Sequence, residues 1–303
     1  MVGIKVHTMI RSYVVRTAAY LCFVWVVVLF HQRAFAAEIQ FRHGVGGSTE
    51  IHTVGADDSL VELARRYDVG YNEIEAANAG VDPFIPDAGI TVTIPGKWIL
   101  PDIQAQKGIV INLAEMRLYY FDVPSRGLVE TFPVGIGDEG WDTPTGTFHI
   151  IEKIVNPAWH VPASIRKQKP ELPRIVPSGP DNPLGTHALR LSLGTVLIHG
   201  TDRPFGIGRR VSHGCIHLYP EDIVRLFRKV RVGTRVVIVR QPVKVATVDN
   251  RVLVEIHADG NEELEEETVN FLERKGLLDR VDNRKLQKAL LVRSGVPTDI
   301  TRN

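Results

Sequence analysis

The middle of the chain, from residue 108 to residue 240, consists mostly of short apolar runs of the kind that form β-strands. Glycine, proline, aspartate and asparagine separate these runs, and only residues 220–230 have the spacing of a helix. Several short strands with turn residues between them predict a mainly β domain, either a sandwich or a barrel-like sheet. The predicted strands are residues 109–112, 117–121, 128–134, 147–154, 188–191, 196–199 and 235–239.

Residues 51–95 follow another pattern, which predicts a strand, two helices and a second strand. Asp58 or Ser59 can cap the first helix, whose apolar face consists of Leu60, Leu63, Ala64 and Tyr67. Asn72 can cap the second helix, and residues 52–54 and 90–94 are strand-like. This order predicts a small α+β module over residues 50–96. We expect the glycine-rich residues 37–50 to form a flexible lead-in, and residues 96–107 to form a linker.

Two further segments differ from the predicted β domain. Residues 156–185 contain seven prolines and few apolar runs, which predicts a lid or a substrate-facing flap rather than an ordinary loop. Alternation over residues 243–256, with Asp249-Asn250 in the middle, predicts a hairpin. The acidic residues 262–267 are expected to begin a helix, because carboxylates stabilise that end of the helix dipole. With one or two helices, these elements form a C-terminal α/β extension over residues 242–303.

The N-terminal segment has the pattern of a secretory signal. Lys5, Arg11 and Arg16 precede an apolar run over residues 18–30, and Ala34-Phe35-Ala36 fits a cleavage site. This run of 13 residues is shorter than the roughly 20 residues that a membrane-spanning helix needs. We therefore predict a signal peptide over residues 1–36. The alternative is an uncleaved anchor in the inner membrane.

Charge excludes some classes of partner. Removal of residues 1–36 leaves 32 basic and 35 acidic residues, a net charge of −3. No basic stripe remains for nucleic acid, and no basic amphipathic helix remains for a membrane surface. Membrane contact is thus expected only through the N-terminal segment.

The mature chain would hold a single thiol, because Cys22 lies in the predicted signal and Cys215 is the other cysteine. His199 ends an apolar run, and Gly200 follows with an accessible carbonyl that can orient the imidazole ring. This pattern has the logic of a nucleophile, a base and a group that orients the base. Gly214 permits a tight turn before Cys215, and the N–H groups of residues 213–215 could converge on an oxyanion.

Two other interpretations of these residues are available. A lone cysteine can be a small buried apolar residue, and lone histidines are often satisfied core residues. His199, His213, Cys215 and His217 also include enough ligands for zinc. They lack a second ligand pair with metal-site spacing, however, so we predict neither a metal nor a cofactor.

Two stretches identify a resemblance. Ile198-His199-Gly200-Thr201 and Gly206-Ile207-Gly208-Arg209-Arg210-Val211-Ser212-His213-Gly214-Cys215-Ile216 closely resemble the signature of the L,D-transpeptidase (YkuD-type) catalytic domain. The resemblance covers residues 107–241. The module over residues 50–96 resembles the LysM peptidoglycan-binding module through His52-Thr53-Val54, Asp57-Asp58-Ser59-Leu60 and Thr93-Ile94-Pro95, although it lacks the usual Pro-Gly turn. A small helical spacer is the alternative for this module.

The resemblance implies a mechanism and a set of partners. The Cys215 thiolate would attack the carbonyl before the terminal D-alanine of a peptidoglycan tetrapeptide stem, and His199 would accept and return protons. A diaminopimelate amine would then give a 3→3 cross-link, the C-terminal lysine of an outer-membrane lipoprotein would give an attached lipoprotein, and water would make the enzyme a carboxypeptidase. Ser212 and His213 would shape the catalytic loop and its oxyanion pocket. The expected location is a Gram-negative periplasm.

One residue departs from the family pattern. The family usually carries arginine two residues after the nucleophile, where this chain has His217. An arginine could bind a substrate carboxylate with both guanidinium nitrogens, and imidazole is a weaker, pH-dependent substitute. Arg209 or Arg210 could supply the missing charge. The rival functions are a peptidoglycan-binding anchor without turnover and an ordinary secreted cysteine peptidase, although a papain-like partner residue is not evident.

Overall fold

The computed structural model describes residues 38–104, 106–122, 127–258, 260 and 263–302. The predicted signal peptide lies outside the described residues. Strands make up 34% of the structure and helices 22%, which confirms the mainly β fold predicted from the sequence. Among the described residues, none of the helices has the length and apolarity needed to cross a membrane.

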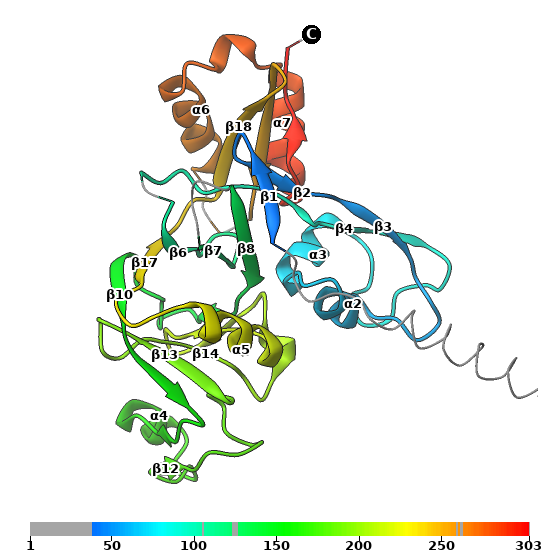
Figure 1. The fold of residues 1–303 in the computed structure, drawn as a ribbon. Coiled ribbons are helices and arrows are strands. Elements are labelled where there is room, and N and C mark those ends of the chain that lie inside the picture. Colours follow the sequence, from blue (N-terminus) through cyan, green and yellow to red (C-terminus); the bar gives the residue numbers. More distant parts are fainter. Residues whose placement is uncertain (1–37, 105, 123–126, 259, 261–262, 303) are drawn as a thin grey trace, which may run out of the picture. The chain divides into compact units, whose positions relative to one another are not determined.

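Most strands of the central region belong to one eleven-stranded sheet, whose labelled strands can be followed in Figure 1. The order through this region is β16-β14-β13-β10-β17-β6-β7-β8. Each run that the sequence predicted as a strand is a strand, with ends that differ by at most one residue, and the two-residue strand β16 was not predicted. The bounds are β6 (Gly108–Asn112), β7 (Arg117–Phe121), β8 (Leu128–Pro133), β10 (Gly146–Val155), β13 (His187–Leu191), β14 (Leu197–His199), β16 (Ile216–His217) and β17 (Arg235–Val239).

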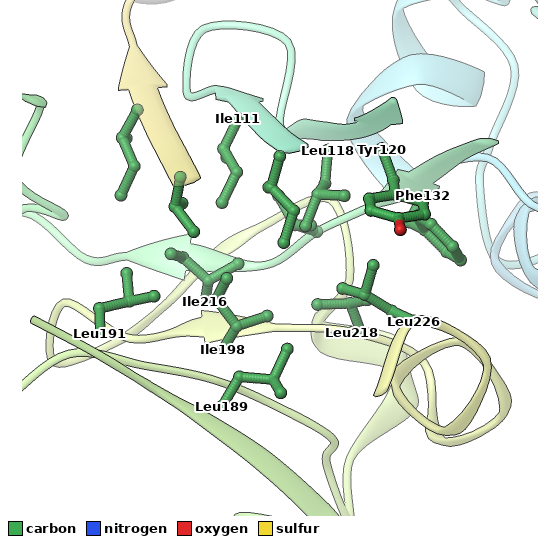
Figure 2. Packing of buried hydrophobic residues seen from close by; sticks show 14 of the residues in the cluster. Ile111, Leu118, Tyr120, Phe132, Leu189, Leu191, Ile198, Ile216, Leu218 and Leu226 are labelled. Carbon is green, nitrogen blue, oxygen red and sulfur yellow. The ribbon is translucent and has the colours of Figure 1, made fainter. Parts of the chain in front are cut away.

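The sheet packs around an apolar core that fixes the strands β14 and β16. Ile111 and Leu118, from β6 and β7, lie across this core from Ile198 and Ile216 (Figure 2). All four side chains are fully buried. The helix α5 (Pro220–Lys229), which the sequence predicted, adds Leu226 to the same core. Strands so packed on one face present their other side chains from a rigid support.

The sequence prediction was wrong for residues 38–50, which form strands instead of a flexible lead-in, and it missed a short strand at the beginning of the predicted linker, where residues 100–104 hold no helix or strand. The strand β1 (Ile39–Arg42) pairs with β8, and β2 (Val45–Gly47) pairs with both β1 and β5 (Lys97–Ile99). The structure explains why glycine occupies two positions in this segment. Gly44 has a φ of 78° in the tight turn between β1 and β2, and a Cβ at Gly46 would lie 2.7 Å from the ring of Phe41.

The small module contains β3 (Glu50–Thr53), α2 (Leu60–Arg66), α3 (Tyr71–Ala77) and β4 (Thr91–Ile94), and β3 pairs with β4. Ser59 caps α2 as predicted, since its hydroxyl accepts a hydrogen bond from the Glu62 N–H at 3.2 Å. The second helix begins at Gly70 rather than at Asn72. The Glu73 carboxylate bonds back to the Gly70 N–H at 2.6 Å, which satisfies this helix end instead.

The module shares a core with the large sheet. Leu60, Leu63 and Ile74 of the module belong to the same apolar cluster as Tyr119 and Val237 of the sheet. A buried ion pair between Arg117 and Glu73 crosses the same boundary. The module is therefore part of one folded unit with the sheet.

The buried ion pair joins Arg117 of β7 to Glu73 of α3. Arg117 donates from Nε and Nη2 to the two carboxylate oxygens at 2.8 and 2.7 Å. The indole of Trp98, in β5, donates to the same carboxylate at 2.9 Å. Arg117 and Glu73 expose 0% and 3% of their side chains, so nearly all of this pairing takes place away from water.

Residues 156–185 hold little regular structure, as their prolines suggested. They contain β11 (Trp159–His160), α4 (Ala163–Gln168) and β12 (Ile175–Val176), and β11 pairs with β12. Asn182 donates from its amide to the backbone oxygens of Pro157 and Pro177, both at 2.9 Å. This amide ties the two ends of the segment together.

The C-terminal extension contains the predicted hairpin and helices. The hairpin consists of β18 (Val243–Val248) and β19 (Arg251–Ile256), and its turn residues Asp249 and Asn250 have positive φ angles of 47° and 63°. The helix α6 (Leu264–Arg274) has three glutamates in its first turn, as expected from the acidic run. The remaining elements are η3 (Leu278–Arg280), α7 (Asn283–Val292) and β20 (Thr298–Asp299).

A buried lysine attaches this extension to the large sheet. Lys244 of β18 lies 2.6 Å from the Glu115 carboxylate and 2.7 Å from that of Glu255. Glu115, Glu255 and His257 are also close enough together to hold a metal ion. The Lys244 ammonium already forms ion pairs with both carboxylates of this cluster, so their negative charge is balanced without a metal ion.

Candidate active site

The edge of the large sheet brings together the histidine and the cysteine that the sequence singled out. The strands β14 and β16 are parallel neighbours, and Ile198 is paired with Ile216 and His199 with His217. The two isoleucines face the core. Because side chains alternate along a strand, the two histidines face away from it, and Cys215, directly before β16, falls on their side.

The backbone holds the His199 ring in one orientation. Its Nδ1 lies 2.6 Å from the carbonyl oxygen of Gly200, and His199 exposes only 2% of its surface. A carbonyl can only accept a hydrogen bond, so Nδ1 carries the proton and Nε2 keeps a free lone pair. Burial lowers the pKa of His199 to about 4, against the opposing effect of the Gly200 hydrogen bond. The ring is therefore a neutral base at neutral pH.

The thiol of Cys215 lies beside β14. Its Sγ is 3.9 Å from the carbonyl oxygen of Thr195, and within the described residues it makes no hydrogen bond to His199. Burial raises the pKa of the Cys215 thiol, although the Leu197 N–H and the charge of Arg190 oppose this effect. Burial thus favours the uncharged form of both groups in this arrangement.

His217 packs against His199, a contact that the sequence did not indicate. Its ring centroid is 4.4 Å from that of His199, with the two rings inclined at 52°. Its backbone N–H and C=O both bond to Gly135 at 2.9 Å. Burial, followed by the proximity of His199, lowers the pKa of His217 well below its usual range. The side chain therefore packs as a neutral ring against the predicted base.

The loop before the thiol is fixed by Ser212. The Ser212 hydroxyl donates to the Cys215 carbonyl at 2.6 Å and accepts from the Gly214 N–H at 3.1 Å. Gly214 has a φ of 94°, which glycine adopts without strain. The Gly214 N–H is therefore occupied within the loop, whereas the sequence had suggested that it could face an oxyanion.

The two arginines proposed to bind substrate lie in different surroundings. The Arg209 guanidinium stacks on Tyr71 of the small module, with Cζ 3.6 Å from the ring centroid. Arg210 donates from Nη1 to the Gly137 carbonyl and to the Asp142 carboxylate, both at 3.1 Å. Arg210 therefore supports the loop over residues 137–142, and Arg209 faces the module.

This loop places Trp141 beside His213. The ring centroids of Trp141 and His213 are 4.7 Å apart, and Trp141 is 37% exposed. Burial, with the charge of Lys169, lowers the pKa of His213. Sequence reasoning missed Trp141 as a neighbour of the catalytic loop. The sequence offered one weak signal for this contact, namely a tryptophan in an exposed turn that contains glycine.

These features define a class of proteins in which a mainly β domain presents a histidine and a cysteine from neighbouring strands, next to a small β-α-α-β module. Comparison with known families identifies both parts. The family model of the L,D-transpeptidase catalytic domain (YkuD) matches residues 106–238, and that of the LysM domain matches residues 52–95.

Whole-chain relatives agree with these matches. The chain is 42% identical over 275 residues to the probable L,D-transpeptidase YcfS of Escherichia coli K12, which covers 85% of each chain. It is 42% identical over 219 residues to the probable L,D-transpeptidase YbiS of the same strain, covering 70% of this chain and 71% of the relative. It is 45% identical over 204 residues to the probable L,D-transpeptidase ErfK/SrfK, covering 65% of each. The chain belongs to the L,D-transpeptidase family, and both resemblances found in the sequence are confirmed.

Proposed function

We propose that this protein is a periplasmic peptidoglycan L,D-transpeptidase that works through a thioester on Cys215. The observation that carries the proposal is the free Nε2 lone pair of His199 on the strand beside that thiol. The LysM domain, which implies peptidoglycan binding, supports the choice of substrate.

The proposed first half-reaction moves one proton and exchanges one acyl bond. The Cys215 thiol leaves the Thr195 carbonyl and turns to Nε2 of His199, which takes its proton as the sulfur attacks the carbonyl before the terminal D-alanine. The C–N bond breaks, and the protonated imidazole returns the proton to the leaving amine of D-alanine. The lowered pKa makes the imidazole a weaker base toward the thiol, but once protonated it is a stronger acid and releases the proton readily to the leaving amine.

The second half-reaction transfers the acyl group. An acceptor amine loses its proton to His199 as it attacks the thioester, and the sulfur leaves and regains a proton. A diaminopimelate amine yields a 3→3 cross-link, and a lipoprotein lysine yields a lipoprotein attached to the wall. Water as acceptor makes the protein an L,D-carboxypeptidase. The second candidate function is a peptidoglycan-binding anchor without turnover, which the LysM domain alone would support.

A muropeptide assay tests the proposal. Purified protein is incubated with a disaccharide-tetrapeptide, and D-alanine, cross-linked dimers and the intact mass of the protein are measured. We expect D-alanine release and a thioester adduct on Cys215. Binding with neither D-alanine nor dimer would support the anchor instead.

A carbapenem separates a transpeptidase from an ordinary cysteine peptidase. We expect an intact-mass adduct on Cys215, because the drug mimics the stem, and no adduct is expected on a peptidase. Muropeptides from cells that lack the protein would identify the acceptor. Loss of 3→3 dimers indicates diaminopimelate, and loss of lipoprotein-linked stems indicates lysine.

Replacing His199 by Gln is expected to lower kcat by about 10²–10⁴-fold, since general base catalysis has this magnitude. The pH profile supplies a second readout. The wild type should lose kcat/KM as pH falls through about 4, where burial places the pKa of His199 in the free enzyme and the base becomes protonated. His199→Gln should lack this acidic limb. A wild-type profile in the variant would remove His199 from the mechanism.

His217→Arg is expected to retain or raise kcat/KM for the tetrapeptide, because the family usually carries arginine at this position. The variant also tests a second role of His217, because its imidazole ring packs on that of His199. A loss of more than about tenfold, or about 1.4 kcal/mol, would show that this packing matters more than a carboxylate-binding charge. Steady-state D-alanine release measures the difference.

A further inference from the structure

An open cavity of about 590 Å³ lies where the LysM domain meets the catalytic domain. Two segments of the LysM domain form most of its wall: residues 56–62, which comprise a loop and the first turn of α2, and the loop residues 84–86. Phe205 and Arg209 of the catalytic domain complete the wall. The cavity is therefore built from both domains.

Apolar side chains from both domains are exposed at this cavity. Phe84 and Ile85 of the LysM domain are 60% and 82% exposed, and Phe205 is 59% exposed. Large apolar side chains gathered in a concave site are typical of a binding surface. Aromatic rings present flat apolar faces that can cover the C–H faces of a sugar ring.

The polar groups favour a neutral ligand. Asp57 and Glu62 are exposed at the wall, and carboxylates accept hydrogen bonds from sugar hydroxyls and acetamido N–H groups. Asp58 is already engaged, at 2.8 Å from His52 and 2.9 Å from Arg66. The excess of carboxylates repels polyanions. Arg209 adds one cation.

The segment that carries Phe205 and Arg209 is held from two sides. The Tyr71 N–H of the LysM domain donates to the Ile207 carbonyl at 3.2 Å, and the Gly208 N–H donates to the Val134 carbonyl at 3.1 Å. The approach is so close that a Cβ at Gly208 would lie 2.2 Å from the Tyr71 nitrogen. Phe205, within η2 (Pro204–Gly206), thus stands at a fixed place opposite the LysM loops.

The same segment continues directly into the catalytic loop. The strand β15 (Arg210–Ser212) follows Arg209, pairs with β9 (Ile136–Gly137) and ends at the serine that fixes the loop before Cys215. Ten residues separate Phe205 from Cys215, a span of at most about 35 Å. A ligand in the cavity would therefore contact one end of the segment whose other end holds the thiol.

The LysM match already implies a glycan as the ligand of these loops. We propose that Phe205 and Arg209 of the catalytic domain form one wall of the glycan site, so that the N-acetylated saccharide is held between the two domains. The inference rests on the proposed function, since it specifies how a glycan is held by an enzyme that acts on peptidoglycan. The LysM domain is thus an incomplete binder by itself, and the catalytic domain supplies one wall.

Isothermal titration of the full-length protein with tetra-N-acetylchitotetraose tests the proposal. Phe205→Ala is expected to weaken binding by about tenfold, as is Phe84→Ala on the opposite wall. Phe205→Tyr, which keeps the ring, should bind like the wild type. Val232→Ala, an exposed apolar residue of the catalytic domain that does not line the cavity, is the matched control.

A second variant reports on the site independently of affinity. In Phe205→Trp, saturating saccharide should change the tryptophan emission beyond the change in the wild type. Unchanged affinity in Phe205→Ala, or no added emission change in Phe205→Trp, would overturn the composite site. Equally tight binding of polygalacturonate would overturn the preference for a neutral ligand.

D-alanine release from a free tetrapeptide keeps this inference separate from the proposed function. Loss of the saccharide result with D-alanine release intact in the wild type would refute the composite site alone. Saccharide binding that depends on Phe205, in a wild type that releases no D-alanine, would support the site and refute the transpeptidase.

Discussion

Replacing Cys215 by Ala is expected to lower D-alanine release from a disaccharide-tetrapeptide by about four orders of magnitude or more, because no other group in the proposed mechanism can form the acyl bond. The thiol is the free cysteine of the described chain and lies beside the strand that carries His199. Steady-state D-alanine release and the intact mass after incubation with substrate measure the loss of turnover and of the adduct.

The control for this variant is saccharide binding in the full-length protein. Cys215→Ala should bind tetra-N-acetylchitotetraose as the wild type does, since Cys215 does not line the cavity. Activity within about tenfold of the wild type would mean that the reaction does not pass through this sulfur.

Glu73→Gln is expected to lower the free energy of unfolding by about 3–5 kcal/mol, because removal of one partner leaves a buried charge without compensation. Arg117 has no exposed surface, and Glu73 accepts two of its hydrogen bonds. The substitution keeps the size of the side chain and removes its charge. Urea unfolding followed by circular dichroism measures the change.

An exposed ion pair of the same length provides the matched control. Glu152 and Arg190 are also 2.7 Å apart, but their side chains are 53% and 36% exposed. Glu152→Gln should cost less than about 1 kcal/mol, because water screens an exposed pair. Equal losses in the two variants would show that burial does not determine the strength of the Glu73–Arg117 pair.

Much of the fold could be predicted because the signals are local. Short apolar runs located the strands of the central sheet, and Ser59 marked the beginning of α2. Positive φ angles at Asp249 and Asn250 match the turn that their residue types predicted. The strands β1 and β2 pair with each other, but they were missed because both are short and their other partners, β8 and β5, are distant in the chain. Ile39 pairs with Val129, and short glycine-containing runs carry no trace of such a partner.

At the candidate site, too, local signals could be predicted from the sequence and long-range contacts could not. The spacing of His199, Gly200 and Cys215 is local and was sufficient to nominate them. The stacking of Arg209 on Tyr71 joins residues that are far apart in the chain, so the sequence alone could not show that this arginine contacts the small module. The neutral state of the thiol and the imidazole depends on burial, which three-dimensional packing determines.

The core shared by the LysM domain and the large sheet has a consequence for how the enzyme would work on a cell wall. A binding domain on a flexible linker raises the local concentration of substrate, and the linker length sets how far the catalytic centre can search. Here a shared core joins the two domains, so a glycan strand bound by the LysM domain is expected to lie at a nearly constant distance from the Cys215 sulfur. Cross-link positions would then follow the dimensions of the protein, as with a template, rather than the length of a tether.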